Sequence, residues 1–471
     1  MLFHSVQFLA LLAVTFALYW KVAKSRVARL SVLLLASVVF YAAWDARPLL
    51  LFGWYAVVNT LFTKGYARWT SPRVRKALLT LTVVNHLALL GLYKYADLFI
   101  GTWGWLGETT GAWAAPALWH LLLPVGLSFI SFQAISYAVD VYRGQVEPKH
   151  GLFEQLVYLL FFPQVVAGPI VRSEDLLERF DMEPWLTVEA GGRGLYRIAM
   201  GVAKKLLVAD VLAVGLVDPV FANPANYTSA ECAVATFAYT FQIYFDFSAY
   251  SDIAIGAAAL FGFHLPENFN KPYRATSLLE FWNRWHLSFS TWLRDYFYIP
   301  IGGNRVSKPK LLRNLFLVMA LGGLWHGADW RFLLWGAIHG VLLMAWRTWW
   351  WIAGKPKGKA YARMVGGFLV TMFFVVFARV FFRASDMAHA TAMFEQLLKF
   401  TPGVANVSLL VWVMLSLAVA SHYVPDGFWS RLGEWFVWMP APVRAVVLIA
   451  LGLLIKRVAS IETQPYIYFQ F

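Results

Sequence analysis

Long runs of apolar residues alternate with short polar or basic stretches along most of the chain. A bilayer crossing needs about 20 mainly apolar residues, so runs of this kind predict membrane-spanning or re-entrant helices. They lie near residues 5–20, 30–44, 49–63, 78–98, 118–139, 152–170, 195–215, 232–262, 314–328, 331–351, 364–383, 405–423 and 440–456. The pattern predicts an all-α integral membrane protein with about 11–13 transmembrane or re-entrant helices. Neither a linker nor a repeat interrupts the chain, so we expect one polytopic membrane domain over residues 1–471.

The composition agrees with a bilayer environment and excludes a soluble protein. Hydrophobic residues make up 60% of the chain and charged residues 14%, whereas a soluble chain carries about a quarter charged residues. The net charge of +14 raises the possibility of nucleic-acid binding, but the basic residues form short clusters between apolar runs. Such clusters are typical of cytoplasmic loops, so we expect a lipid bilayer and no nucleic acid as partner. The single cysteine, Cys232, excludes a disulfide framework.

The basic clusters predict the orientation. Lysines and arginines concentrate in the segments 21–29, 64–77 and 302–313. Cytoplasmic loops carry an excess of these residues, so we expect all three segments in the cytoplasm and the N-terminus outside. The first apolar run lacks a basic leader and a small-residue cleavage site, and we interpret it as a retained span.

The segment 279–300 is too polar for an ordinary span. Read as one helix, it gathers aromatic residues on one face, namely Phe281, Trp285, Phe289, Trp292 and Tyr296. The opposite face carries Asn283, His286, Ser290 and Arg294. This division predicts an amphipathic helix that lines a polar cavity or lies at the membrane interface, with His286 facing the polar side.

His326 is the strongest candidate for chemistry. Twelve helical residues past Arg313 rise by about 18 Å, which puts His326 near the middle of the bilayer. Gly322-Gly323 before it and Gly327 after it predict a broken helix at that depth. An ionisable residue there is by default a functional hypothesis, the alternative being a histidine that ties two spans together. His339 shows a weaker form of this pattern and is more often a packing or supporting residue.

The surrounding sequence limits the chemistry that His326 could perform. No HxxxH or HxxE spacing surrounds His286 or His326, so we predict no metal site. A serine-nucleophile elbow, GxSxG, is also missing. What remains is a neutral imidazole that takes a proton from a hydroxyl group as that oxygen attacks an activated acyl group.

Several of these segments together resemble the membrane-bound O-acyltransferase family. The resemblance rests on Phe281 to Ser288 (FWNRWHLS), Trp292 to Tyr296 (WLRDY), Gly323 to Gly327 (GLWHG), Pro163-Gln164 with Ala167 to Ile170, Tyr244 to Asp252, and Asn268 to Tyr273. The tail from Gln464 to Phe471 is similar to the branch that contains the alginate O-acetylation membrane subunit. The resemblance covers the chain from end to end.

The resemblance implies a ring of helices around a central tunnel and a catalytic role for His326, with His286 as a second tunnel histidine. Residues that would line the tunnel or support the site are Asn283, Trp325, His339, Ser290 and Arg294, of which Asn283 and Trp325 are candidates for stabilising the oxyanion. The resemblance also implies acetyl-CoA as the acyl donor. Candidate contacts for the donor phosphates are Lys271, Arg274, Arg284, Lys308 and Lys310, although cytoplasmic orientation explains most of them equally well.

The resemblance also implies a setting: a multi-pass protein of the bacterial inner membrane that passes acetyl groups outward for O-acetylation of an exopolysaccharide such as alginate. The implied partners are a periplasmic acetyltransferase or acyl-relay protein and, downstream, the polysaccharide. Two alternatives stay open. One is a transporter or flippase of a lipid-linked sugar, which would usually carry acidic residues inside its spans. The other is a lipid-to-protein acyltransferase.

Overall fold

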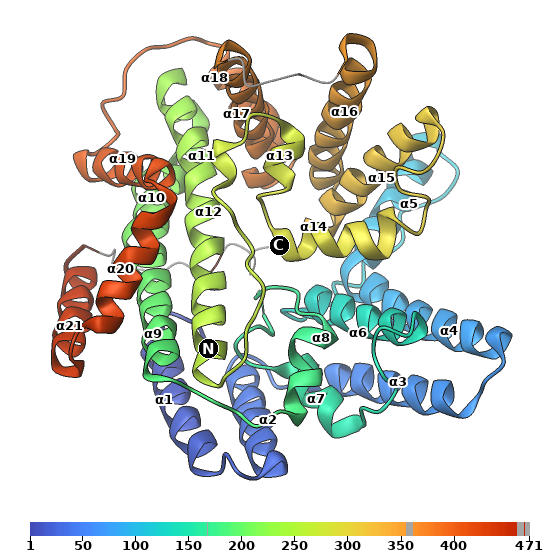
Figure 1. The fold of residues 1–471 in the computed structure, drawn as a ribbon. Helices are drawn as coiled ribbons and strands as arrows, with labels where there is room; N and C mark the ends of the chain where they lie inside the picture. The colour runs from blue at the N-terminus through green and yellow to red at the C-terminus, as the bar shows by residue number, and fades with distance from the viewer. Residues whose placement is uncertain (167, 355–360, 459–465, 467–471) are drawn as a thin grey trace. The chain divides into compact units, whose positions relative to one another are not determined.

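The computed structural model describes residues 1–166, 168–354, 361–458 and 466, and within these ranges the chain is helical and forms no β-strand (Figure 1). The predicted all-α class is therefore confirmed. The tail motif apart from Tyr466, the lysines between 355 and 360, and Ala167 lie outside the described residues. By their internal contacts the residues form two compact units, the first Met1–Gly194 with Ala254–Pro266 and the second Leu195–Ile253 with Glu267–Phe471.

The first unit contains the N-terminal helices. They are α1 (Val6–Lys21), α2 (Arg26–Ala42), α3 (Pro48–Arg68), α4 (Pro72–Leu90), η1 (Gly91–Tyr95), α5 (Ala96–Thr110), α6 (Leu127–Tyr142), α7 (Leu152–Leu160), α8 (Ser173–Leu176), η2 (Glu178–Asp181) and the beginning of α9 (Val188–Ala203). The helix predicted over 118–139 begins only at Leu127. Pro116 and Pro124 remove backbone donors there, and His120 and Gly126 have positive φ angles, so residues 111–126 cannot continue a helix.

A buried polar network joins α3, α4 and α6 in this unit. The His86 ring stacks on Tyr55, with 4.5 Å between centroids, and its Nε2 lies 3.0 Å from Oδ1 of Asn59. The Tyr55 hydroxyl lies 2.9 Å from Oγ of Ser131 and 3.1 Å from the carbonyl of His86. Buried polar groups are stable only when hydrogen-bonded. His86 is thus a structural histidine.

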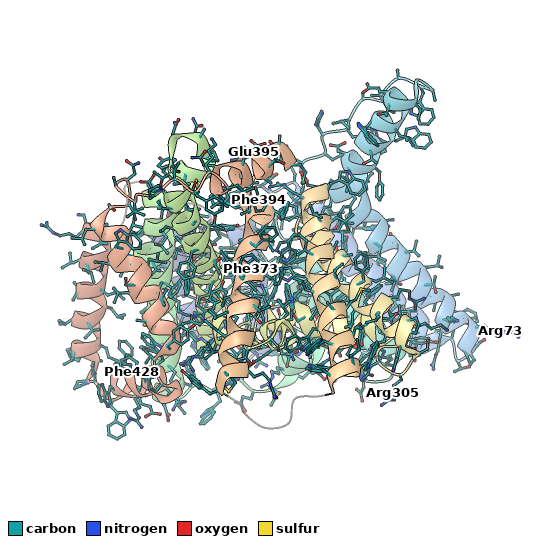
Figure 2. The ribbon with its side chains drawn as sticks, turned by 90° about the horizontal axis from the view of Figure 1, so that it is seen from above. Arg73, Arg305, Phe373, Phe394, Glu395 and Phe428 are labelled. Carbon is teal, nitrogen blue, oxygen red and sulfur yellow. The ribbon has the colours of Figure 1, made fainter. Side chains whose placement is uncertain are left out.

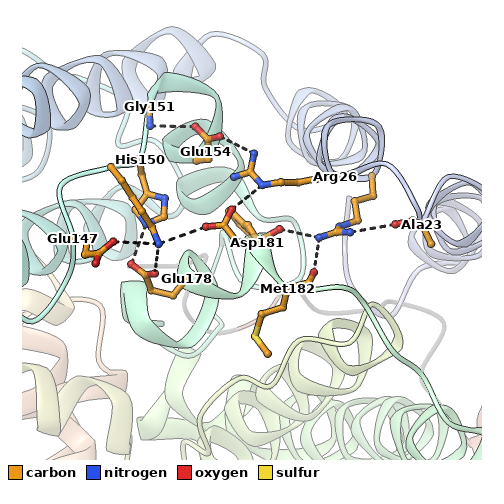
Figure 3. Close-up of polar contacts among 12 residues, drawn as sticks. Ala23, Arg26, Glu147, His150, Gly151, Glu154, Glu178, Asp181 and Met182 are labelled. Atoms are coloured by element: carbon orange, nitrogen blue, oxygen red, sulfur yellow. Dashed lines mark hydrogen bonds and ion pairs between the residues drawn. The ribbon is translucent and has the colours of Figure 1, made fainter.

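Charged residues tie α2 to α7 and to η2 at one end of the first unit (Figure 3). Arg26 bonds both Glu154 of α7, at 3.0 Å, and Asp181 of η2, at 2.8 Å. Glu178 accepts hydrogen bonds from His150 and Lys149. Although partial burial opposes it, these bonds lower the pKa of Glu178. A basic residue of the predicted cytoplasmic segment 21–29 therefore also stabilises the fold.

The second unit holds the remaining helices. They are the end of α9, η3 (Lys204–Ala209), α10 (Asp210–Leu212), η4 (Ala213–Val217), α11 (Asp218–Ala222), η5 (Pro224–Asn226), most of α12 (Ser229–Leu260), η6 (Pro272–Arg274), α13 (Leu278–Trp282), α14 (Leu287–Leu293), η7 (Arg294–Tyr298), α15 (Lys308–His326), α16 (Trp330–Ala353), α17 (Tyr361–Arg383), α18 (Met387–Leu397), α19 (Leu409–Tyr423), α20 (Asp426–Trp438) and α21 (Ala441–Val458). Figure 2 shows Phe373 on α17 and Phe394 on α18. These two helices pack through Phe377 and Phe394, whose ring centroids lie 4.9 Å apart.

Glycines bring α15 and α16 into close contact. A Cβ atom at Gly323 would lie 2.2 Å from the Phe332 carbonyl oxygen, and one at Gly336 would lie 2.3 Å from the carbonyl oxygen of Met319. Small residues of this kind let helix backbones approach closely inside a membrane. The predicted break at His326 is confirmed, since α15 ends there and Gly327 is extended, but Gly322-Gly323 do not cause it because α15 runs through both. Gly323 instead allows the close packing that holds the end of α15 beside α16.

We expect Gly323→Ala to lower the folded yield and the melting temperature, because an added methyl group would clash with backbone that cannot turn aside. Overpacking of this kind costs about 1–3 kcal/mol. Gly366→Ala on α17 is the matched control, since a Cβ there meets nothing within 4 Å. It should leave the melting temperature unchanged or raise it, because alanine is the better helix former. Equal behaviour of the two variants in a thermal melt would refute the packing role.

Two helical stretches are long and apolar enough to cross a bilayer, Pro72–Thr110 and Tyr361–Arg383. The helices α19 and α20 would form a third crossing if their pair, bent by 98°, is one broken span. These counts refer to the described residues and to length and composition alone. The number of 11–13 crossings and the tunnel stay predictions.

The orientation also stays a prediction, and the structure supplies suitable positions for testing it. Ser71, Thr110 and Ser307 are exposed at helix ends, while the native Cys232 is buried. We expect cysteines at Ser71 and Ser307 to resist an impermeant thiol reagent applied to intact cells. A cysteine at Thr110, at the other end of the Pro72–Thr110 stretch, should be labelled. The reverse pattern would invert the orientation.

Candidate active site

The segment 279–300 is not the single helix that the sequence predicts. It divides into α13, a turn, α14 and the π-helical turn η7. His286 lies in the turn with a φ angle of +46°, in the left-handed region that non-glycine residues seldom occupy. Strained backbone of this kind is held in place by its surroundings and is often found at functional sites. The break brings the His286 side chain into the interior, where it is 1% exposed.

Residues 268–270 hold this turn. The Leu287 amide donates to the Asn268 carbonyl and the Asn270 amide to the Arg284 carbonyl, both at 2.9 Å. Between them Phe269 and Trp285 form an isolated antiparallel bridge. The extended segment 268–270 therefore hydrogen-bonds to backbone groups that have no helical partner where the helix is broken.

The contacts of Asn268 also fix the proton on His286. The Ser288 backbone N–H, which can only donate, lies 3.3 Å from Oδ1 of Asn268, so this atom is the amide oxygen. His286 Nδ1 lies 3.3 Å from the same oxygen and must therefore carry the hydrogen. In the neutral ring Nε2 then holds the free electron pair. Asn268 therefore orients the His286 ring, and this contact was not predicted from the sequence although Asn268 stands in one of the quoted motifs.

His326 ends α15 and is 5% exposed. Its ring lies 5.0 Å from Phe382 and 5.3 Å from Trp335, measured between centroids. The next residue, Gly327, is required because a Cβ there would lie 2.1 Å from the Phe332 ring. The glycine of the Trp-His-Gly motif thus lets Phe332 pack at the end of α15.

His286 and His326 lie on the same pair of stacked rings. Phe289 and Trp325 stack with 4.2 Å between centroids. The His286 ring lies 5.1 Å from Phe289 and 5.8 Å from Trp325. The His326 ring lies 5.9 Å from Phe289 and 4.9 Å from Trp325. The structure therefore brings together the two histidines that the sequence singled out, in an apolar aromatic setting.

His339 lies next to this group. Its ring is 4.8 Å from Trp335 and 5.2 Å from Trp282, and it is 2% exposed. Trp335, which contacts both His326 and His339, was not predicted from the sequence because one tryptophan among 23 carries no signal of its own.

Three predicted polar residues lie elsewhere. Asn283 is exposed at the end of α13, and Arg294 is exposed and paired with its neighbour Asp295 at 2.7 Å. Ser290 is half-buried and donates to the Trp285 carbonyl. The prediction that they lie on the same face as His286 assumed one unbroken helix over 279–300. The turn separates Asn283 from His286, whereas Ser290 stays one helical turn away and donates its backbone N–H to the His286 carbonyl at 2.9 Å.

Most of the predicted phosphate contacts have structural partners. Lys271 and Arg274 both donate to the Val424 carbonyl at the end of α19, and Arg284 pairs with Glu280 at 2.8 Å. Lys308 and Lys310 are exposed at the start of α15. The two exposed lysines are therefore the better candidates for donor contacts.

Two acidic residues of α12, the buried Asp246 and the half-buried Asp252, pair with lysines. Asp246 pairs with Lys205 at 2.7 Å, and Asp252 pairs with Lys204 at 2.6 Å. Asp210 shares Lys205 at 2.8 Å. These pairs give the carboxylates a structural role in the second unit. Across the described ranges, no three His, Cys, Asp or Glu side chains gather as a group that could hold a metal ion.

Comparison with known proteins identifies the family. The model of the membrane-bound O-acyltransferase family matches residues 146–382, a range that includes His286, His326 and His339. The chain is 41% identical over 371 residues to the probable alginate O-acetylase AlgI of Pseudomonas aeruginosa, covering 78% of this chain and 69% of that protein. It is 33% identical over 407 residues to the peptidoglycan O-acetyltransferase of Helicobacter pylori, covering 80% and 74%.

A more distant relative is the teichoic acid D-alanyltransferase of Bacillus subtilis, with 27% identity over 235 residues that cover 48% of this chain and 59% of that protein. The relatives named here share acyl transfer and differ in the acyl group or the acceptor that their names give. The apolar helices and the histidine pair agree with that chemistry. The chain is an O-acyltransferase and belongs to the membrane-bound O-acyltransferase family.

Proposed function

We propose that the protein passes acetyl groups from cytoplasmic acetyl-CoA through the bacterial inner membrane for O-acetylation of an exopolysaccharide such as alginate. The observation that carries the proposal is the pair of buried histidines on the Phe289–Trp325 stack, within the family-matched range. The similarity to AlgI supports the acetyl group and the polysaccharide. Exposed Lys308 and Lys310 are the proposed contacts for the donor phosphates.

In the proposed reaction His326 is the general base. Its imidazole takes the proton of an acceptor hydroxyl as that oxygen attacks the thioester carbonyl carbon. The tetrahedral intermediate collapses, the carbon–sulfur bond breaks, and the thiolate of coenzyme A leaves and is protonated. His286, with the electron pair on Nε2, is the second proton acceptor of the site. The buried aromatic surroundings exclude water, which would otherwise hydrolyse the thioester.

The proposed immediate acceptor is a periplasmic acetyltransferase or acyl-relay protein, which hands the acetyl group to the polysaccharide. Acetyl content of the exopolymer is the direct test. Cells that lack the gene should make polymer without O-acetyl groups, and the wild-type gene should restore them. Unchanged acetylation in the deletion strain would contradict the proposal.

A rival route within the same site is a covalent acyl-histidine. Purified protein incubated with radiolabelled acetyl-CoA and no acceptor distinguishes the two. Direct transfer predicts that no stable label stays on the protein, whereas label on a peptide containing His326 would establish the covalent route.

A further inference from the structure

A buried arginine, Arg379, contacts one of the aromatic rings that surround His326. Arg379 belongs to α17, one of the stretches able to span a membrane, and it is 2% exposed. Its guanidinium carbon lies 4.7 Å from the Trp285 ring centroid and 5.6 Å from that of Phe382. Phe382 also contacts His326, with 5.0 Å between ring centroids. The guanidinium carbon of Arg379 therefore lies at most about 11 Å from the centroid of the His326 ring. Charged residues inside membrane spans are costly and are mostly functional.

Arg379 has no carboxylate partner among the described residues. Its Nε atom meets no hydrogen-bond acceptor in those ranges. The guanidinium interacts with the Tyr273 hydroxyl, which is neutral and already donates its proton to the Thr240 carbonyl. The neighbouring arginine of α17 differs: Arg383 pairs with Asp218 at 2.6 Å. A buried cation without an anion is unfavourable unless something supplies the negative charge.

The residues around Arg379 offer further donors that the described part of the protein does not use. The buried Nε1 atoms of Trp282 and Trp335 find no acceptor there, and Nδ1 of His339 finds no partner. The three rings contact one another, with centroid distances of 4.8–5.7 Å, and the charge of Arg379 acts on His339. Arginine and indole nitrogens can only donate. Several buried donors in one cluster can be satisfied by acceptor oxygens of a ligand.

We propose that Arg379, with Trp282, Trp335 and His339, binds an anionic oxygen group of the substrate, a carboxylate or a phosphate, next to His326. This inference rests on the proposed acyl transfer and names the charge of the molecule that enters the site. A carboxylate would mean that an acidic sugar, in place of the relay protein, is the immediate acceptor. A phosphate would mean that Arg379, in place of Lys308 and Lys310, binds the donor. Arg379 is then a substrate-binding residue. Without bound substrate its uncompensated buried charge lowers the stability of the fold.

The test is a thermal melt of the full-length protein in detergent with two pairs of probes, glucuronate against glucose and coenzyme A against pantetheine. Saturating glucuronate or coenzyme A should raise the melting temperature of the wild type by several degrees, and its neutral counterpart should not. Arg379→Met should abolish the shift and Arg379→Lys should keep part of it. Arg383→Met is the matched control on the same helix and should keep the full shift.

Which probe acts identifies the source: a response to glucuronate assigns the carboxylate and a response to coenzyme A assigns the phosphate. Without a probe, Arg379→Met should melt at the same temperature as the wild type or higher, because it removes an uncompensated buried charge. In a transfer assay Arg379→Met should raise KM for the anionic substrate by about 10–100-fold, the loss of affinity expected when a hydrogen bond to a charged group is removed.

The inference is overturned if no anionic probe shifts the wild type, if the shift survives in Arg379→Met, or if Arg379→Met without probe melts well below the wild type. The last result would make Arg379 a structural cation. His326→Ala separates this failure from failure of the proposed function. Loss of acyl transfer in His326→Ala, with no Arg379-dependent shift in the wild type, would reject the anion site and keep the proposed function.

Discussion

His326→Ala is expected to lose acetyl transfer by about 10²–10⁴-fold, the contribution of a positioned general base, while the protein stays folded. His326→Gln keeps a polar side chain but cannot take up the proton, so it should be nearly as inactive. Folding should be retained because His326 is the last residue of α15 and the substitution leaves the helix before it unchanged. Initial rates of transfer from acetyl-CoA, beside thermal melts of the same preparations, measure both quantities.

The matched control is His264→Ala, which removes an exposed histidine from a loop. It should have wild-type activity and stability. If His326→Ala also kept near wild-type activity, the assignment of the site would be wrong. If it instead failed to fold, His326 would be the structural tie between two spans that the sequence left as an alternative.

His286→Asn is expected to lose about 10²-fold or more of the activity, since it removes the second proton acceptor of the site. Asparagine tolerates the left-handed backbone and can donate to Oδ1 of Asn268, so the turn should stay intact. His286→Ala should be equally inactive and less stable by on the order of 1 kcal/mol, because it loses the hydrogen bond to Asn268.

Comparing these two substitutions separates chemistry from folding. Equal inactivity with unequal melting temperatures is the expected result. Wild-type activity in His286→Asn would show that the imidazole is not needed. An activity loss that appeared only in the less stable His286→Ala would make His286 a purely structural residue.

The sequence predicted most of the helices because long apolar runs are a strong signal, although the runs 118–139 and 152–170 are only partly helical. It predicted the wrong local geometry where two short segments pair. The spacing of the aromatic residues over 279–300 predicts one regular helix. The sequence alone does not show that Asn268 and its neighbours bond to the backbone on either side of His286. For that reason Asn283 does not share a helix with His286. The histidine pair was found because each residue stands in a distinctive motif.

Gly323 and Arg379 illustrate two other limits. Glycines near a candidate residue can break a helix or let another helix approach, and only the position of α16 decides in favour of approach. Arg379 looked like one more basic residue near the end of an apolar run. Its meaning depends on the absence of a carboxylate among the described residues around it, which no single-chain pattern reports.

The most direct test of the central claim uses sealed, inverted membrane vesicles that carry the full-length protein and enclose an acceptor. Radiolabelled acetyl-CoA is supplied outside, on the former cytoplasmic face. We expect label to accumulate on the enclosed acceptor with the wild type and with His264→Ala, and to fall to background with His326→Ala. Equal labelling by wild-type and His326→Ala vesicles, or none by the wild type when donor and acceptor are both present, would contradict the account.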